Sequence, residues 1–117
     1  MATIDTLPKD VQGVFLVTSP SLDPRLSEFS QAAAQRGLAV GAYSHVEDTA
    51  LVTYTSDTFL IGKQAARMAD QVLRGIAPAD LPVETAEYFL TINLKTAKTL
   101  NLDIPDDVLR QAKTVIR

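Results

Sequence analysis

The chain has 117 residues, enough for one small domain or for part of a larger protein. Hydrophobic residues make up 46% of it and charged residues 21%, which is typical of a packed globular chain and excludes a disordered one. The net charge of −3 gives no electrostatic basis for binding nucleic acid or an anionic membrane, and the lack of cysteine excludes disulfides and thiolate metal sites.

Targeting and cofactor motifs are also missing. The first ten residues lack the basic and apolar regions of a secretory signal, and no apolar run approaches the roughly 18 residues of a membrane span. The sequence contains no G-x-G-x-x-G, Walker or G-x-S-x-G motif, and its single histidine, His45, cannot form a histidine-rich metal site. We therefore expect a soluble chain without a cofactor and without catalysis.

The first predicted unit is strand, helix and parallel strand. Residues 11–18 contain a continuous apolar block, which predicts a strand buried on both faces of a sheet. A helix should follow, capped by Ser21 or Asp23 and ended by Gly37, because these residue types favour helix starts and helix ends. Residues 38–43 predict the second buried strand, joined to the first by a right-handed crossover.

The segment 51–75 organises the rest of the chain. It begins as an apolar strand and changes to helical periodicity after a polar turn, where Ser56 or Asp57 can cap the helix. Gly75 suits the left-handed residue after the last turn. The apolar stripe of this helix consists of Ile61, Ala65, Met68 and Val72.

The C-terminal part returns to the sheet. A loop at 76–82 contains two prolines, residues 88–94 predict a fourth strand, and residues 95–101 predict a short helix. Pro105 should open a final helix that runs to residue 116. The pattern predicts an α/β fold, a Rossmann-like three-layer sandwich with a mostly parallel sheet of four strands.

Four ordered runs in residues 62–116 resemble the C-terminal end of a known family. That family is the ABC-transporter substrate-binding proteins of the type I periplasmic-binding fold, which includes members that bind tryptophan or tyrosine. The runs are G-x-x-A-A-x-M-x-x-x-V-L-x-G, P-A-D-L-P-V-E, I-N-L-K-T-A-K and a final I-P helix, at Gly62–Gly75, Pro78–Glu84, Ile92–Lys98 and Ile104–Ile116.

The resemblance implies a bilobed receptor with its ligand between the lobes. The whole chain, 1–117, would be one α/β domain, the C-terminal lobe fragment of such a protein. Within it, residues 10–57 would form the βαβ part of the second lobe, residues 58–75 a crossing helix, and residues 83–117 the return strand and C-terminal helices. It also implies a periplasmic or other extracytoplasmic location and an ABC permease as partner.

Three polar strand ends are candidate ligand sites, because in open α/β sheets such ends face one crevice. The hydroxyls of Thr18, Ser19 and Ser21 suit a carboxylate or another small anion, or else serve only as turn and cap groups. Tyr43 and Ser44 close the second strand, where the ring could stack on an aromatic ligand or simply be half-buried.

The third end contains Thr55, Ser56 and Asp57. The family resemblance places this segment at the crossing between lobes, so Asp57 would meet the ammonium group of an amino-acid ligand. The alternative is that Asp57 only caps the helix, and both roles are compatible with one carboxylate. Asp103, Asp106 and Asp107 lack the glycine and glutamate of a calcium loop, so we interpret them as acids of a helix start.

Two function classes remain open. The first is the solute-binding component of an ABC transporter, which binds an amino acid or an aromatic or carboxylated compound. The alternative is a stand-alone α/β sensory or dimerisation domain without a transport role. A phosphorylated receiver is disfavoured, because Thr18 and Ser19 stand where acidic residues would be needed. If the first lobe is absent, the apolar stripe of the 58–75 helix lacks a partner, and we expect a homodimer through this helix.

Overall fold

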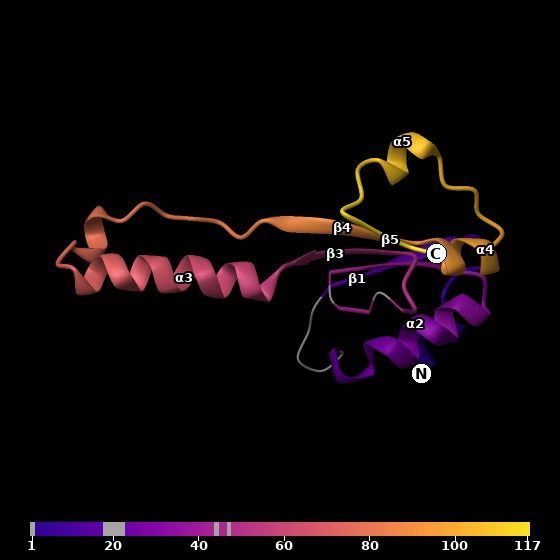
Figure 1. Ribbon diagram of the computed structural model, residues 1–117. Coiled ribbons are helices and arrows are strands. Elements are labelled where there is room, and N and C mark those ends of the chain that lie inside the picture. Colours follow the sequence, from indigo (N-terminus) through magenta and orange to yellow (C-terminus); the bar gives the residue numbers. More distant parts are fainter. Residues whose placement is uncertain (1, 18–22, 44, 47) are drawn as a thin grey trace. The chain divides into compact units, whose positions relative to one another are not determined.

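The computed structural model describes residues 2–17, 23–43, 45–46 and 48–117. These residues form two compact units (Figure 1). The first comprises the chain up to Thr55 together with Phe89–Arg117, and the second is Ser56–Tyr88. The chain therefore passes out of the first unit at the end of its third strand and re-enters it in its fourth.

One five-stranded sheet has the order β1-β2-β3-β4-β5. Strands β1, β2 and β3 are parallel, and β5 is parallel to β4. The Asn93 N–H, at the end of β4, donates to the Leu51 carbonyl just before β3 at 2.9 Å, and Figure 1 shows β4 running antiparallel to β3. The predicted α/β class with a mostly parallel sheet is confirmed. The strands are Gly13–Leu16, Ala39–Ala42, Val52–Ser56, Tyr88–Asn93 and Thr114–Ile116.

Helices occupy both sides of this sheet. Figure 1 shows α2 and α5 on opposite sides of it. The α-helices are α1 (Ala2–Asp5), α2 (Leu26–Gln35), α3 (Thr58–Leu73), α4 (Leu94–Thr99) and α5 (Asp106–Leu109), and the short 3-10 helices are η1 (Asp23–Arg25) and η2 (Pro78–Asp80).

The main core lies between α2 and the face of the sheet that α2 covers. Leu26 and Ala33 of α2 pack there with Leu16, Val40 and Ala42, all of them buried. The spacing of Leu26 and Ala33, seven residues, keeps both on one side of the helix, and alternate strand residues point to that same face. Burial of these side chains holds β1 and β2 against α2, with the carboxyl ends of both strands at one edge.

The prediction that the first strand is buried on both faces is wrong. Leu16 is buried, but 61% of Phe15 is exposed, and so is most of Val17. In this structure β1 is an edge strand, and its second face is not covered by α2. The Phe15 ring instead lies over Gly41, where an added Cβ would come within 2.7 Å of the ring carbon Cδ2.

The expected final helix to residue 116 is also wrong. Helix α5 ends at Leu109, and Thr114–Ile116 form a fifth strand beside β4. These three residues are all β-branched, which favours a strand wherever a neighbouring strand offers free backbone groups. The Lys113 N–H donates to the Leu90 carbonyl at 2.9 Å, and the Lys113 ammonium lies 3.4 Å from the centre of the Phe89 ring.

Several predicted helix ends are confirmed. Gly37 and Gly75 follow α2 and α3 with φ values of +73° and +96°, in the region that glycine adopts without steric cost. The start of α2 differs from the prediction. The N-cap position is Arg25, without a side-chain cap, because η1 takes up Asp23 and Pro24 before the α-helix begins. Ser21 lies outside the described residues.

Candidate functional site

The candidate site begins at the carboxyl edge of the parallel strands. Because β1, β2 and β3 are parallel, their carboxyl ends lie along one edge, where α/β proteins gather ligands. Four of the predicted ligand-binding residues fall outside the part of the chain that the structure describes: Thr18, Ser19, Ser21 and Ser44.

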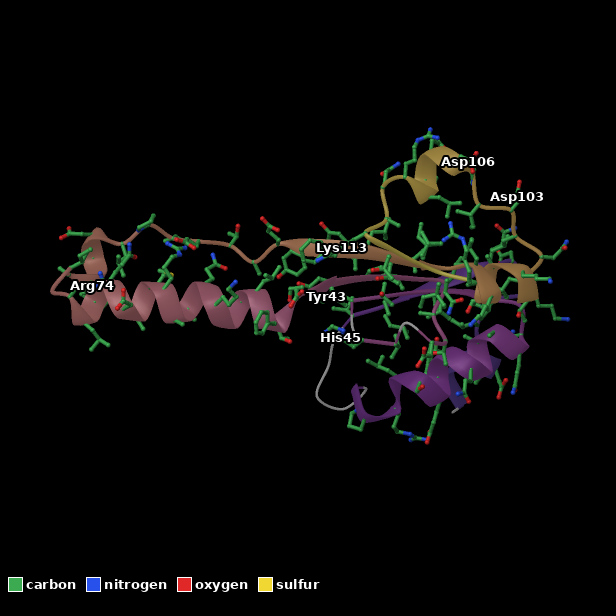
Figure 2. The ribbon with its side chains drawn as sticks, in the orientation of Figure 1. Tyr43, His45, Arg74, Asp103, Asp106 and Lys113 are labelled. Carbon is green, nitrogen blue, oxygen red and sulfur yellow. The ribbon has the colours of Figure 1, made fainter. Side chains whose placement is uncertain are left out.

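Tyr43 is the predicted site residue that follows β2 (Figure 2). Its backbone N–H donates to the carbonyl of Leu16, the last residue of β1, at 2.9 Å. The backbone of Tyr43 is therefore fixed at the carboxyl edge, with its side chain half-buried. His45, two residues later, is exposed.

Thr55 stands near the end of β3, at the same edge. The register pairs Ala42 of β2 with Thr53, so Thr55 lies two residues beyond the last paired position. Alternation along the strand places Thr55 on the face of Thr53, which is buried. Tyr43 and Thr55 thus follow neighbouring strands in the first unit.

Asp57 belongs to the second unit, where it is the N-cap of α3. Its Oδ1 atom accepts hydrogen bonds from the backbone N–H groups of Phe59 and Leu60, at 3.0 and 3.2 Å. The capping role that the sequence predicted is therefore confirmed. Both bonds use the same oxygen, so Oδ2 takes no part in the cap. An oxygen in this position can accept from a ligand without loss of the cap.

A groove of about 450 Å³ runs beside Asp57 within the second unit. It lies between the first turns of α3 and residues 81–87, which join η2 to β4 and which we call the return segment. Both acidic and basic side chains line it. The residues that line it are Asp57, Leu60, Ile61, Lys63, Gln64, Arg67, Glu84, Thr85 and Glu87.

Glu84 ties the return segment to α3 across this groove. Its carboxylate accepts from Gln64 Nε2 at 2.6 Å and from Arg67 Nη2. The Arg67 hydrogen bonds, and secondarily the bond from Gln64, lower the pKa of Glu84 below its ordinary value of 4.5. Glu84 is thus engaged with α3, whereas Asp57 keeps an oxygen for other contacts. Sequence reasoning missed this tie, because 17 residues separate Arg67 from Glu84.

Two exposed aromatic residues on the sheet were also missed. The register puts Phe15, Gly41 and Val52 in one row across β1, β2 and β3. Tyr54, two residues after Val52, lies on that same face and is 46% exposed. The only sequence signal was Gly41, a glycine inside a strand, which often marks close approach of another group.

The structure shows neither a metal cluster nor a membrane-spanning helix in the part it describes. Among the described residues, no three His, Cys, Asp or Glu side chains lie close enough together to hold a metal ion. Asp103 lies just before α5, and Asp106 is the first residue of this helix (Figure 2). No helix built from described residues combines the length and the apolar character needed to cross a membrane.

Solved structures of several larger proteins share this fold. A conserved domain protein from Vibrio cholerae superposes with a TM-score of 0.79 at 24% identity, over 97% of this chain and 40% of that one. An ABC domain in complex with L-Trp from Streptococcus pneumoniae gives 0.80 at 24% identity, over 98% and 40%. A ligand-free, open substrate-binding protein with adhesive properties from Clostridium difficile gives 0.76 at 21% identity, over 98% and 39%.

The chain therefore spans about 40% of the length of the first two of these proteins. No protein with a curated description matches the sequence. A family model described as ABC transporter substrate binding protein matches residues 2–116, nearly the whole chain. On that match, this chain belongs to the ABC transporter substrate-binding protein family.

Proposed function

We propose that this chain is the C-terminal part of an extracytoplasmic solute receptor that delivers a small molecule to an ABC permease. The observation that carries the proposal is the family match over residues 2–116. The ligand would lie between two lobes, of which this chain supplies about one and the crossing to the other. Ligand that bridges the lobes stabilises a closed form, which the permease recognises. No bond is broken in this cycle, so the proposed role is not enzymatic.

The proposed ligand is an amino acid, or an aromatic or carboxylated compound of similar size. The unused Oδ2 of Asp57 supports an ammonium contact at the beginning of α3. Hydroxyl groups of Thr18, Ser19 and Ser21 would bind the ligand's carboxylate. We include the side chains of Tyr43, Ser44 and Thr55 as further ligand contacts, because each stands at the end of a parallel strand. A neighbour of known structure was solved with L-Trp, a compound that has an ammonium group, a carboxylate and an aromatic ring.

The ammonium contact can be tested on the 117-residue chain itself. The Phe59 and Leu60 amides donate to Asp57, so their NMR shifts report directly on this carboxylate. We expect millimolar L-tryptophan to move both resonances, and N-acetyl-L-tryptophan, which has no ammonium group, to leave them in place. Equal shifts from the two compounds, or none from either, would contradict the proposal.

Asp57→Asn is the matched variant, because asparagine caps a helix about as well as aspartate but has no charge. The variant should keep the helix content of α3 and lose the response to L-tryptophan. In a full-length receptor with aspartate at this position, we expect the same change to weaken an amino-acid ligand by about 1.5–3 kcal/mol. An unchanged affinity would leave Asp57 with the capping role alone.

A further inference from the structure

The chain passes between its two units at two points, and both points lie inside strands. The first unit ends at Thr55, within β3, and resumes at Phe89, the second residue of β4. Any change in the arrangement of the two units must therefore be absorbed by backbone dihedral angles close to these two crossings. The residues that fix each crossing to either unit decide where the chain between them can bend.

In the second unit, the two crossings are fixed to α3 by Asp57 and Glu84. Asp57 caps the helix through two backbone N–H groups, and Glu84 accepts from Gln64 and Arg67 of the same helix. Ser56 separates Asp57 from the first unit, and residues 85–88 separate Glu84 from it. The second crossing therefore has the longer segment between its fixed positions.

Lys113 fixes this second crossing to the first unit. It immediately precedes β5 and contacts two successive residues of β4 (Figure 2). Its N–H donates to the Leu90 carbonyl at 2.9 Å, and its ammonium lies 3.4 Å from the centre of the half-buried Phe89 ring. The register pairs Thr91 with Thr114, so the bond from Lys113 to Leu90 continues the pairing of β4 and β5 by one residue towards the crossing.

The ammonium group supplies the part of this contact that depends on the side chain. Every residue except proline would supply the backbone N–H at position 113, but only a basic one brings a positive charge over the aromatic face of Phe89. Strand β5 has three residues, so few backbone hydrogen bonds hold its beginning. The contact with Phe89 therefore adds a side-chain attachment where the pairing of β4 and β5 begins.

We propose that Lys113 is a positioning residue, which fastens the start of β4 to the first unit and confines bending of the second crossing to residues 85–88. The inference rests on the proposed function, because this bending would serve the closure of two lobes around a solute. A shorter flexible segment has fewer conformations in the open form, so closure costs less conformational entropy. Loss of the contact would extend the flexible segment to Phe89 and Leu90 and weaken solute binding.

NMR on the 117-residue chain locates the end of the flexible segment without a ligand. Nitrogen-15 relaxation of the wild type should show residues 85–88 to be mobile on the nanosecond timescale, and Phe89 and Leu90 to be as rigid as the rest of β4. Lys113→Gln should make Phe89 and Leu90 mobile and speed hydrogen exchange of the residue 113 amide about two- to fivefold. Lys113→Arg keeps a cation over the ring and should match the wild type. Lys98→Gln, which removes an exposed lysine from α4, should also match it.

A second amide distinguishes a local change from a general loss of stability. The Asn93 N–H donates to the Leu51 carbonyl, between β4 and β3. Faster exchange at both Asn93 and residue 113 in Lys113→Gln would indicate general destabilisation and overturn the proposal, as would Phe89 and Leu90 that stay rigid. Phe89→Leu should have the same effect as Lys113→Gln, and the double variant should show no further change, because both substitutions remove one contact. Additive effects would contradict the proposal.

A full-length receptor with lysine and phenylalanine at these positions separates this inference from the proposed function. The probe is the amino acid that binds the wild type most tightly in a calorimetric panel. Lys113→Gln should weaken its binding at least about twofold, and Lys113→Arg should restore it. A wild type that binds no amino acid would contradict the proposed function, while relaxation in the 117-residue chain still decides on Lys113. Equal affinity of the wild type and Lys113→Gln overturns the positioning role.

Discussion

At the scale of single residues, two hydroxyl groups stand out within the core. The side chains of Ser30 on α2 and Thr53 on β3 are 0% and 2% exposed, and neither hydroxyl oxygen has a hydrogen-bond partner among the described residues. Thr53 pairs in register with Ala42 and therefore faces the side of the sheet that α2 covers. A buried hydroxyl without a partner costs free energy, because it gives up its bonds to water and gains none in return.

Thr53→Val should therefore stabilise the fold. Valine keeps the shape and the β-branching of threonine and removes the unsatisfied hydroxyl, so we expect the free energy of unfolding to rise by about 1 kcal/mol. The control is Thr114→Val on edge strand β5, where the side chain is exposed and the change should stay within about 0.5 kcal/mol. Urea denaturation measures both. If Thr53→Val instead lowers the free energy of unfolding, the Thr53 hydroxyl has a hydrogen-bond partner in solution and the prediction is wrong.

At the scale of elements, α3 depends on a long-range tie more than on a core. Its described contacts bury no residue completely, and Glu84 of the return segment joins it through Arg67 and Gln64. The N-cap from Asp57 and the left-handed Gly75 fix the two ends of the helix locally. The ends of α3 thus depend on residues within or next to the helix. Its contact with the return segment depends on Glu84, which lies 17 residues after Arg67.

The tie between Arg67 and Glu84 should respond to acid. The pKa of Glu84 is lower in the folded chain than its ordinary 4.5, so its contribution to stability is present above that value. The contribution is lost as the pH falls through the lowered pKa, because the protonated carboxyl no longer pairs with Arg67. Carbon-13 NMR of the Glu84 carboxyl should show a titration midpoint below 4.5.

The matched variant for this titration is Arg67→Gln, which keeps a polar side chain on the helix and removes the cation. We expect the Glu84 midpoint to move up towards its ordinary value in this variant, because the largest cause of the lowered pKa is gone. A midpoint that does not move would assign the shift to another group.

At the scale of the whole molecule, the chain matches only about 40% of the length of its structural neighbours. Affinity in a bilobed receptor comes from enclosure of the ligand by both lobes, which excludes water and supplies contacts from two sides. The described residues include the carboxyl ends of β2 and β3 and the segment that leads from β3 into α3. Under the proposed function, the 117-residue chain supplies only part of that enclosure.

We expect this chain alone to bind amino acids weakly, with dissociation constants well above the micromolar range. Isothermal calorimetry with an amino-acid panel, L-tryptophan included, measures this directly. A micromolar ligand would contradict the prediction and would show that a single lobe encloses the solute.

Sequence alone determined the features that depend on neighbouring residues. The two left-handed glycines, the Asp57 cap and the order of strands and α-helices from β1 to β4 follow from backbone preferences and hydrophobic period, which act over a few residues. The N-terminal helix α1 was not predicted. Of the candidate site, the sequence marked the strand ends that contain Tyr43, Thr55 and Asp57.

Tertiary structure decided what depends on partners distant in the sequence. Thr114–Ile116 became a strand because β4 offered backbone groups to pair with, and that gain outweighs the helical pattern of the segment. Phe15 is exposed because it points away from the core under α2, and an apolar run cannot reveal which face of a strand is covered. Glu84 joined the groove beside Asp57 because the return segment brings its carboxylate back to Arg67. Each of these outcomes depends on which segments meet in space, and local propensity contains no information about that.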